Sequence, residues 1–202
     1  MNEFFNTLKT QRWDDHRYYH QSRINQSLHF ISAISFLVAY AYLFIDPVIS
    51  GLIAWVISMG TRQAGHFFFE PDGFDEINQV TNQYKEDVKV GYNLSRKKVL
   101  IAICVAVPFF AFWMPSAITW MVPQDFENSA LRITGITWLL LGVAGVVFRM
   151  IQLLFIDGWL ASISWGTKII TDPFHDIMLY YKSPFYLLKG ELLDPMTHVR
   201  GG

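Results

Sequence analysis

The chain has 202 residues, of which 52% are hydrophobic and 16% aromatic, and its mean hydropathy is +0.25. This apolar content exceeds what a soluble domain of that size needs for its core, so the composition predicts an integral membrane protein. The net charge of -1 gives no excess of basic residues. This balance excludes a nucleic-acid-binding protein, because such proteins need a concentrated basic face.

The first predicted element is an interfacial N-terminal helix that leads into the first apolar segment. Residues 1–10 lack an apolar core of signal-peptide length, so no cleaved signal is expected. A break near Gln21 or Ser22, with Ser22 as N-cap and Asn25 at the third helical position, would begin a new helix. Residues 28–45 are then apolar and long enough to cross a bilayer, which predicts the first span.

The second predicted span follows the first after a short turn. Asp46-Pro47 interrupts the apolar sequence, and residues 48–69 are apolar again. Because the turn is so short, the first two spans should form a hairpin. The charged residues 70–98 come next and predict an extramembrane loop.

The second half of the chain supplies two more apolar segments. Residues 99–122 predict a third span, with kinks at Pro108 and Pro115. Residues 131–156 predict a fourth span, whose glycines offer a small-residue face for close helix contact. These glycines are Gly135, Gly142 and Gly145.

The last segment, residues 157–202, mixes aromatic residues with lysine, which is typical of an interfacial region. Lysine and arginine concentrate before the first span and in the 70–98 loop, whereas the turns on the other side hold almost none. The positive-inside rule therefore predicts cytoplasmic N and C termini, in a bacterial inner membrane or an ER-type membrane. The expected fold is one all-α domain over residues 1–202, a polytopic membrane bundle of about four transmembrane helices with interfacial N- and C-terminal helices.

This topology brings four histidines to the cytoplasmic side of the membrane. His20 and His29 lie at the start of the first span, His66 lies at the end of the second, and His175 follows the fourth. On one straight helix His20 could not share a face with His29, but the predicted break would let His20 fold back. The sequence therefore predicts a metal site formed by His20, His29, His66 and His175.

Two of these histidines have a polar residue on the same helix face. Asn25 lies four residues before His29, and Glu70 lies four residues after His66. Imidazoles with a carboxylate and open coordination positions suit non-haem Fe(II), although zinc and manganese use many of the same ligands, so the spacing does not select the metal. We expect a catalytic set of His20, His29, His66 and Glu70, with supporting roles for Asn25, Glu70 and Asp176.

Each of these assignments has a simpler alternative. A histidine near a membrane interface is often an amphipathic residue that binds water or lipid headgroups. His16, among charged residues, is a weaker ligand candidate for this reason. Glu70 precedes Pro71, so it could either end a helix or serve as a ligand or orienting group.

Two arginines lie where a substrate carboxylate could bind. Arg62 precedes His66 by one helical turn, and Arg149 lies inside the apolar fourth span. An intramembrane charge usually faces the bundle interior with a partner. The functional interpretation assigns Arg62 and Arg149 to substrate binding. The alternative for Arg149 is a structural charge pair or snorkelling toward the interface.

Two motifs resemble those of the membrane family typified by the fungal 2-hydroxy fatty acid (2-hydroxypalmitate) dioxygenase. They are Tyr19-His20-x4-Asn25-x3-His29 and Gly65-His66-x3-Glu70. The resemblance covers about the first 75 residues. It implies an Fe(II)-dependent oxygenase that uses histidine ligands and molecular oxygen to shorten a 2-hydroxy fatty acid by one carbon. His175 is a candidate through topology and not through this resemblance.

The resemblance thus implies an iron-dependent membrane dioxygenase of fatty acid metabolism, with a 2-hydroxy fatty acid, molecular oxygen and membrane lipid as partners. Two other classes remain open. One is a different metal-dependent lipid enzyme, such as a di-iron hydroxylase or a zinc hydrolase. The other is a non-catalytic lipid-binding or scaffold protein with interfacial histidines, which would bind no metal.

Overall fold

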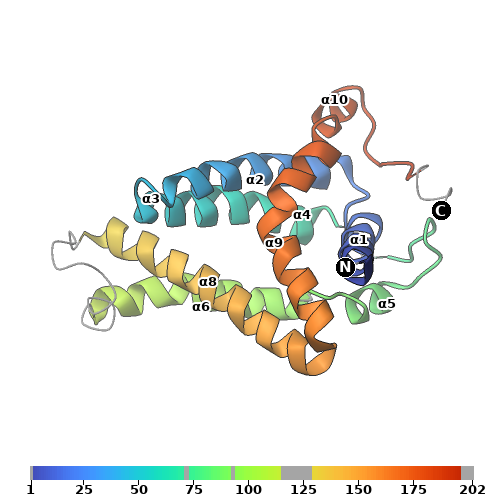
Figure 1. Cartoon of the computed structure of the whole chain (residues 1–202). Helices are drawn as coiled ribbons and strands as arrows, with labels where there is room; N and C mark the ends of the chain where they lie inside the picture. The colour runs from blue at the N-terminus through green and yellow to red at the C-terminus, as the bar shows by residue number, and fades with distance from the viewer. Residues whose placement is uncertain (1, 71–72, 92–93, 115–128, 197–202) are drawn as a thin grey trace.

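The computed structural model describes residues 2–70, 73–91, 94–114 and 129–196, and its named elements are all helices (Figure 1). The all-α prediction is therefore confirmed. The elements in chain order are α1 (Asn2–Tyr19), α2 (Arg23–Tyr42), α3 (Pro47–Leu52), the π-helix η1 (Ile53–Met59), α4 (Gly60–Phe68), α5 (Asn82–Asp87), α6 (Leu94–Trp113), α8 (Ala130–Ile156), α9 (Gly158–Tyr180) and α10 (Ser183–Leu188).

The turn between α1 and α2 forms as the sequence predicted. The Ser22 side chain accepts a hydrogen bond from the backbone N–H of Asn25 and so caps the start of α2. At the other end, Asp46 caps α3 through the N–H of Val48, and Pro47 is the first residue of that helix. The predicted helix start at Ser22 and the break at Asp46-Pro47 are both confirmed.

The return arm of this hairpin differs from the single span expected over residues 48–69. It consists of α3, η1 and α4, which run back beside α2 (Figure 1). Within η1, the Ser58 hydroxyl donates to the carbonyl of Ile53, five residues earlier, in keeping with the wider register of a π-helix. Trp55 ties this arm to α8 by donating from its indole N–H to the carbonyl of Trp138 at 2.9 Å.

Glycine allows α3 and α8 to touch through their backbones. A Cβ atom at Gly51 would overlap the Gly135 carbonyl oxygen, and one at Gly135 would overlap the carbonyl of Val48. The small-residue contact predicted for Gly135 is thus confirmed. Gly142 and Gly145 do not make such contacts, since a Cβ atom there would come no closer than 3.9 Å to the Trp55 indole nitrogen and would meet nothing within 4 Å, respectively.

Two helices in the described part of the chain are long and apolar enough to cross a bilayer. They are α2 and α8, whose most apolar windows have mean hydropathies of 1.2 and 2.3. Only 11% of the α8 window is buried, so its apolar side chains face outward, which is the opposite of a soluble core helix. The prediction of four spans is not confirmed. α6 contains Pro108 and ends at Trp113, and residues 115–122 of the expected 99–122 span lie outside the described residues.

The C-terminal region is more integrated than the interfacial segment predicted for residues 157–202. α9 packs against α1, α2 and α8, and crosses the bundle in Figure 1. It buries polar side chains, including Lys168 and Asp172, because they have partners inside the bundle. After α10, the backbone N–H of Asp194 donates a hydrogen bond to the carbonyl of Gln21 at 2.8 Å. The segment after α10 therefore stabilises the turn between α1 and α2.

Candidate metal centre

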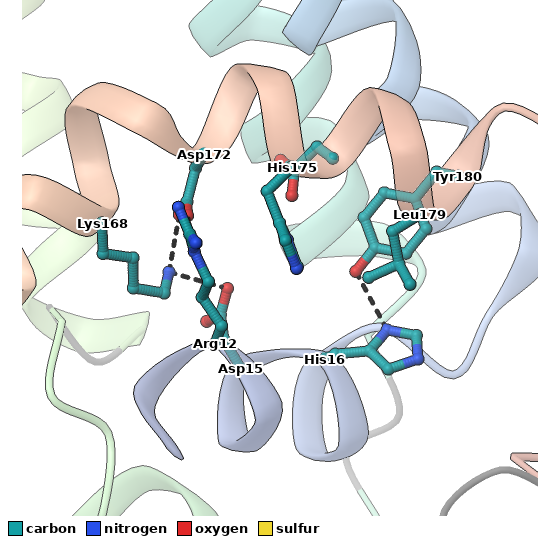
Figure 2. Close-up of a pocket in the computed structure, with 9 residues that line it drawn as sticks. Arg12, Asp15, His16, Lys168, Asp172, His175, Leu179 and Tyr180 are labelled. Carbon is teal, nitrogen blue, oxygen red and sulfur yellow. Dashed lines mark hydrogen bonds and ion pairs between the residues drawn. The ribbon is translucent and has the colours of Figure 1, made fainter. Parts of the chain in front are cut away.

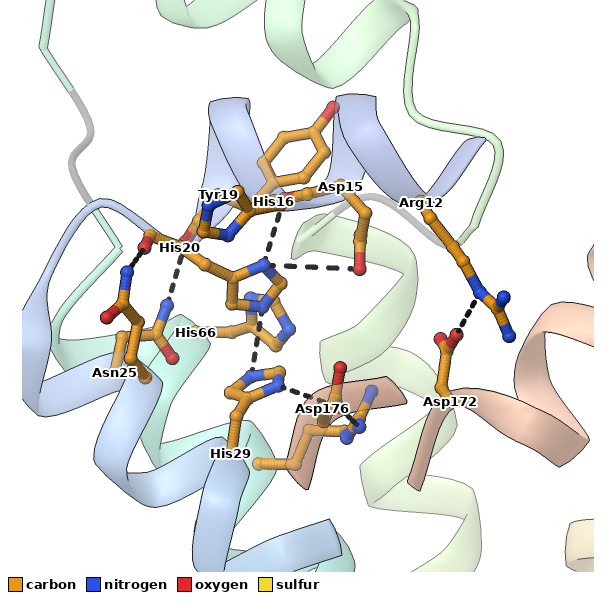
Figure 3. A network of polar contacts seen from close by, with 12 residues as sticks. Arg12, Asp15, His16, Tyr19, His20, Asn25, His29, His66, Asp172 and Asp176 are labelled. Atoms are coloured by element: carbon orange, nitrogen blue, oxygen red, sulfur yellow. Dashed lines mark hydrogen bonds and ion pairs between the residues drawn. The ribbon is translucent and has the colours of Figure 1, made fainter. Parts of the chain in front are cut away.

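Three histidines from separate segments converge at the end of the bundle where α1, α2, α4 and α9 meet (Figure 3). His20, His29 and His66 are at most 7% exposed, and each offers a ligand atom within 4.8 Å of the others. His20 folds back from the α1–α2 turn, so that its Nε2 lies 3.2 Å from the Nε2 of His29. The convergence expected for these three residues is what the structure shows.

The orientation of His20 follows from the atom that faces its other nitrogen. His20 Nδ1 lies 2.9 Å from the backbone carbonyl oxygen of Asp15. A carbonyl can only accept, so Nδ1 carries the proton and Nε2 has the free lone pair. Burial lowers the pKa of His20 well below its ordinary value, with a further contribution from nearby His29. His20 is therefore held as a neutral imidazole with Nε2 directed at the other two rings.

Glu70 orients His66 in a similar way. One carboxylate oxygen, Oε2, lies 2.6 Å from His66 Nδ1, and the other accepts from the ammonium of Lys89 at 3.1 Å. Burial raises the pKa of the Glu70 carboxyl, while Lys89 opposes the rise. Because Glu70 occupies Nδ1, the Nε2 atom of His66 is left to bind a metal. Of the roles left open for Glu70, its contacts favour orienting His66 over binding a metal directly.

Asp176 lies behind the third histidine. Its Oδ2 atom is 3.8 Å from His29 Nδ1 and also pairs with the guanidinium of Arg62. His29 Nδ1 is buried and makes no hydrogen bond within the described structure, and the Asp176 carboxylate lies just beyond hydrogen-bond distance of it. Asp176 thus lies next to His29, and its supporting role stays a prediction.

Asn25 and Gly65 fit together at the contact between α2 and α4. The fully buried Asn25 donates from Nδ2 to the carbonyl of Tyr19 at 2.8 Å, which fixes the turn that carries His20. A Cβ atom at Gly65 would overlap Asn25 Oδ1 and would lie 3.5 Å from the His29 ring. The glycine before His66 therefore lets α4 approach α2 closely enough for the histidines to meet.

The chemistry of this donor set fits a transition metal ion. His20, His29 and His66 are buried, and the Nδ1 atoms of His20 and His66 face acceptor oxygens, so the lone pairs of these two rings are on Nε2. The lone pair of His20 Nε2 faces His29 Nε2 at 3.2 Å. Histidine ligands whose second nitrogen is held by a carbonyl or carboxylate are the usual arrangement in protein metal sites. A three-histidine set also leaves coordination positions open, as catalytic sites require. The residues present are compatible with iron, zinc or manganese.

His175 does not join the other three histidines. It is half-buried and lines a small polar cavity between α1 and α9, together with Arg12, Asp15 and His16 (Figure 2). The structure therefore gives no support to His175 as a metal ligand. Its neighbour Asp176 faces His29 instead, because adjacent side chains on a helix point in different directions. His16 is also outside the group, since its Nδ1 lies 3.1 Å from the Tyr180 hydroxyl.

The two arginines expected to bind substrate lie in different surroundings. Arg62 is beside the site, pairs with Asp176 and has a buried Nε–H without a hydrogen-bond acceptor in the described structure. Arg149 donates to the backbone carbonyls of Val90 and Gly91, the first at 2.6 Å through one terminal nitrogen. These contacts favour the structural alternative for Arg149.

The sequence analysis did not predict a group of charged residues that lies next to the histidines. Lys168 on α9 lies between Asp15 and Asp172, at 3.1 and 2.7 Å. The signal for this group was present in the four-residue spacing of α9, because positions four apart share one helix face. These positions are Lys168, Asp172, Asp176 and Tyr180.

Comparison with known proteins agrees with the geometry of the site. Residues 6–73 match the model of a family described as 2-hydroxy-palmitic acid dioxygenase Mpo1-like. No curated protein and no solved structure matches the chain. The matched segment contains all three converging histidines with Asn25 and Glu70, and α9 lies beyond it. The segment that carries the three histidines is therefore similar to the 2-hydroxy-palmitic acid dioxygenase Mpo1-like family.

Proposed function

We propose that the protein is an Fe(II)-dependent membrane dioxygenase that acts on 2-hydroxy fatty acids and shortens them by one carbon. The observation that carries the proposal is the convergence of His20, His29 and His66 in a buried group of ligand atoms. The family described for residues 6–73 supplies the class of reaction and substrate. A scaffold protein with unrelated interfacial histidines would have no need for such a group.

His20, His29 and His66 would hold the metal through their Nε2 atoms. Bound Fe(II) would supply redox chemistry toward molecular oxygen and a Lewis-acid centre for the hydroxyl and carboxylate of the substrate. The protein contributes by holding the imidazoles neutral and oriented through the Asp15 carbonyl and Glu70. Burial of the three rings limits access of bulk water to the site.

Arg62 is the group we assign to the substrate carboxylate. Its guanidinium lies beside Asp176, and its buried Nε–H is without an acceptor in the described structure, so it can donate to an incoming anion. Asp176 would hold Arg62 in place while also facing His29. Arg149 is a weaker candidate because backbone carbonyls already occupy its guanidinium.

The apolar surface suits a lipid substrate. α8 and α6 expose large apolar side chains along their length, and α2 adds more near the histidines. Such surfaces are stable when lipid covers them, so we infer a multi-pass membrane protein whose termini and metal site face the cytoplasm. The acyl chain of the substrate would lie between helices, with its polar end at the site.

The experiment supplies 2-hydroxypalmitate to the detergent-purified protein after anaerobic loading with Fe(II). We expect oxygen consumption and a product one carbon shorter, identified by mass spectrometry, and we expect neither with palmitate, which lacks the hydroxyl. His66→Ala should abolish turnover and leave expression and detergent stability nearly unchanged. If the iron-loaded wild type consumes no oxygen with 2-hydroxypalmitate, the proposed reaction is wrong.

A further inference from the structure

A chain of charges, buried at Lys168 and Asp172, joins α9 to the histidine site, although α9 lies outside the family-matched segment. The ammonium of Lys168 is 3.1 Å from Asp15 Oδ2 and 2.7 Å from Asp172 Oδ2 (Figure 2). Arg12 contacts the other oxygen of Asp172 at 3.5 Å. Lys168 is only 7% exposed, so its charge depends on these carboxylates.

Lys168 pairs with two carboxylates, and only one of them, Asp172, lies on its own helix. Burying an ammonium group is costly unless it is paired and hydrogen-bonded. Asp172, four residues along the same helix, would already pair with Lys168 as a local contact. Asp15 comes from α1 instead, 153 residues away in sequence, so Lys168 ties α9 to the helix that leads into His20.

Asp15 is held at two points. Lys168 binds the Asp15 carboxylate (Figure 2). The Asp15 carbonyl accepts the hydrogen bond from His20 Nδ1 at 2.9 Å (Figure 3). The Asp15 carboxylate itself lies 4.0 Å from the same nitrogen. A shift of Asp15 would therefore turn the His20 ring and move the Nε2 atom that faces His29.

The charge state of the contact agrees with its geometry. Burial alone would lower the pKa of Lys168, but Asp15 and Asp172 raise it above its ordinary value. Burial alone would raise the pKa of Asp15, but the ammonium of Lys168 lowers it below its ordinary value. Both partners are thus charged at neutral pH.

We propose that Lys168 is a positioning residue of the histidine site, because by holding the Asp15 carboxylate it fixes the carbonyl that orients His20. The inference rests on the proposed binding of a metal by His20, His29 and His66. It adds to that proposal a residue of the C-terminal region that the family match does not include.

The test measures Co(II) affinity and the visible absorption spectrum of the Co(II)-loaded protein in detergent, with the thermal stability of the metal-free protein as a second readout. Lys168→Met should weaken Co(II) binding by about 10- to 100-fold, as other losses of support behind metal ligands do, and should alter the spectrum. Lys168→Arg keeps the charge and should recover much of the affinity. Asp15→Asn, which weakens the same contact and keeps the carbonyl, should lower affinity in the same direction.

The control is Arg132→Met. This variant breaks a 3.0 Å ion pair between Arg132, in the first turn of α8, and Asp46, and the pair includes no residue of the histidine site. It should lower thermal stability and leave Co(II) affinity and spectrum unchanged, which separates positioning from general stabilisation. Wild-type affinity and spectrum in both Lys168→Met and Asp15→Asn would overturn the inference. Failure of the wild type itself to bind Co(II) would overturn the metal site, and the role of Lys168 with it.

Discussion

In two of the histidines, one oxygen atom next to Nδ1 determines which ring nitrogen carries the proton. The Asp15 carbonyl faces His20 Nδ1, and a Glu70 carboxylate oxygen faces His66 Nδ1. In each ring this leaves the lone pair on Nε2, and in His20 that atom lies 3.2 Å from His29 Nε2. The three rings that could hold a metal are thus ordered by contacts within the protein, which would reduce the free energy needed to order a metal site.

Glu70 offers the most direct test of this orientation. Glu70→Ala should weaken metal binding by about 10- to 100-fold, because His66 loses the acceptor at Nδ1. Glu70→Gln should have a smaller effect, since the amide oxygen can still accept. The measurement is a competition titration against a chelator of known affinity.

The control for Glu70 is Glu86→Gln. Glu86 contacts the same lysine, Lys89, at 3.3 Å, and that contact does not involve a histidine of the site. We expect wild-type metal affinity from this variant. Equal affinities for Glu70→Ala and the wild type would show that Glu70 does not orient His66.

The buried His20 also predicts how the stability of the metal-free protein depends on pH. Its folded-state pKa is well below 6.5, so the unfolded chain binds a proton that the folded chain does not as the pH falls through 6.5. The contribution of His20 to the free energy of unfolding is therefore complete above that pH and decreases below it. Chemical unfolding at pH 7.5 and 5.5 should show a larger loss in the wild type than in His20→Gln. Identical losses would mean that His20 is protonated or exposed in the folded protein.

At the scale of elements, the close crossing of α3 and α8 depends on glycines, which have no side chain to keep the two backbones apart. Gly51 and Gly135 bring backbone against backbone, whereas Gly145 on the same helix has free space around it. Gly135→Ala should lower the free energy of unfolding by about 1–3 kcal/mol through overpacking. Gly145→Ala should be neutral or stabilising by up to about 1 kcal/mol, because alanine favours the helix. Thermal unfolding in one detergent compares them, and equal destabilisation by both would contradict the close crossing.

The elements that sequence predicts well are those with a local chemical signal. Ser22 and Asp46 cap helices through their own side chains, so the breaks before α2 and α3 could be located without tertiary information. The π-helical register of Ile53–Met59 has no such signal, because apolar residues there fit an α-helical span equally well. The aromatic and lysine content of α9 predicts an interfacial segment, because composition alone does not show that a charged face of this helix packs inward.

At the scale of the whole molecule, residues from the N-terminal and the C-terminal parts of the chain lie together at the site. Residues 6–73 contain the three histidines, and α9 adds Asp176 and Lys168 behind them. The topology of a helical bundle was enough to predict that His20, His29 and His66 meet. The topology could not show whether His175 joins them. It gives the level of a residue in the membrane, but not which face of α9 points toward the other helices. Asp176 occupies the inward face instead.

The most direct test of the central claim is elemental analysis of the protein purified in detergent without chelator. The wild type should carry near-stoichiometric iron, His66→Ala should lose it, and His175→Ala should keep it, because His175 lies outside the group of three ligands. Samples exposed anaerobically to Fe(II) and then desalted control for loss of metal during purification. A wild type without any transition metal after this treatment, or a His66→Ala variant that retains as much iron as the wild type, would contradict the account.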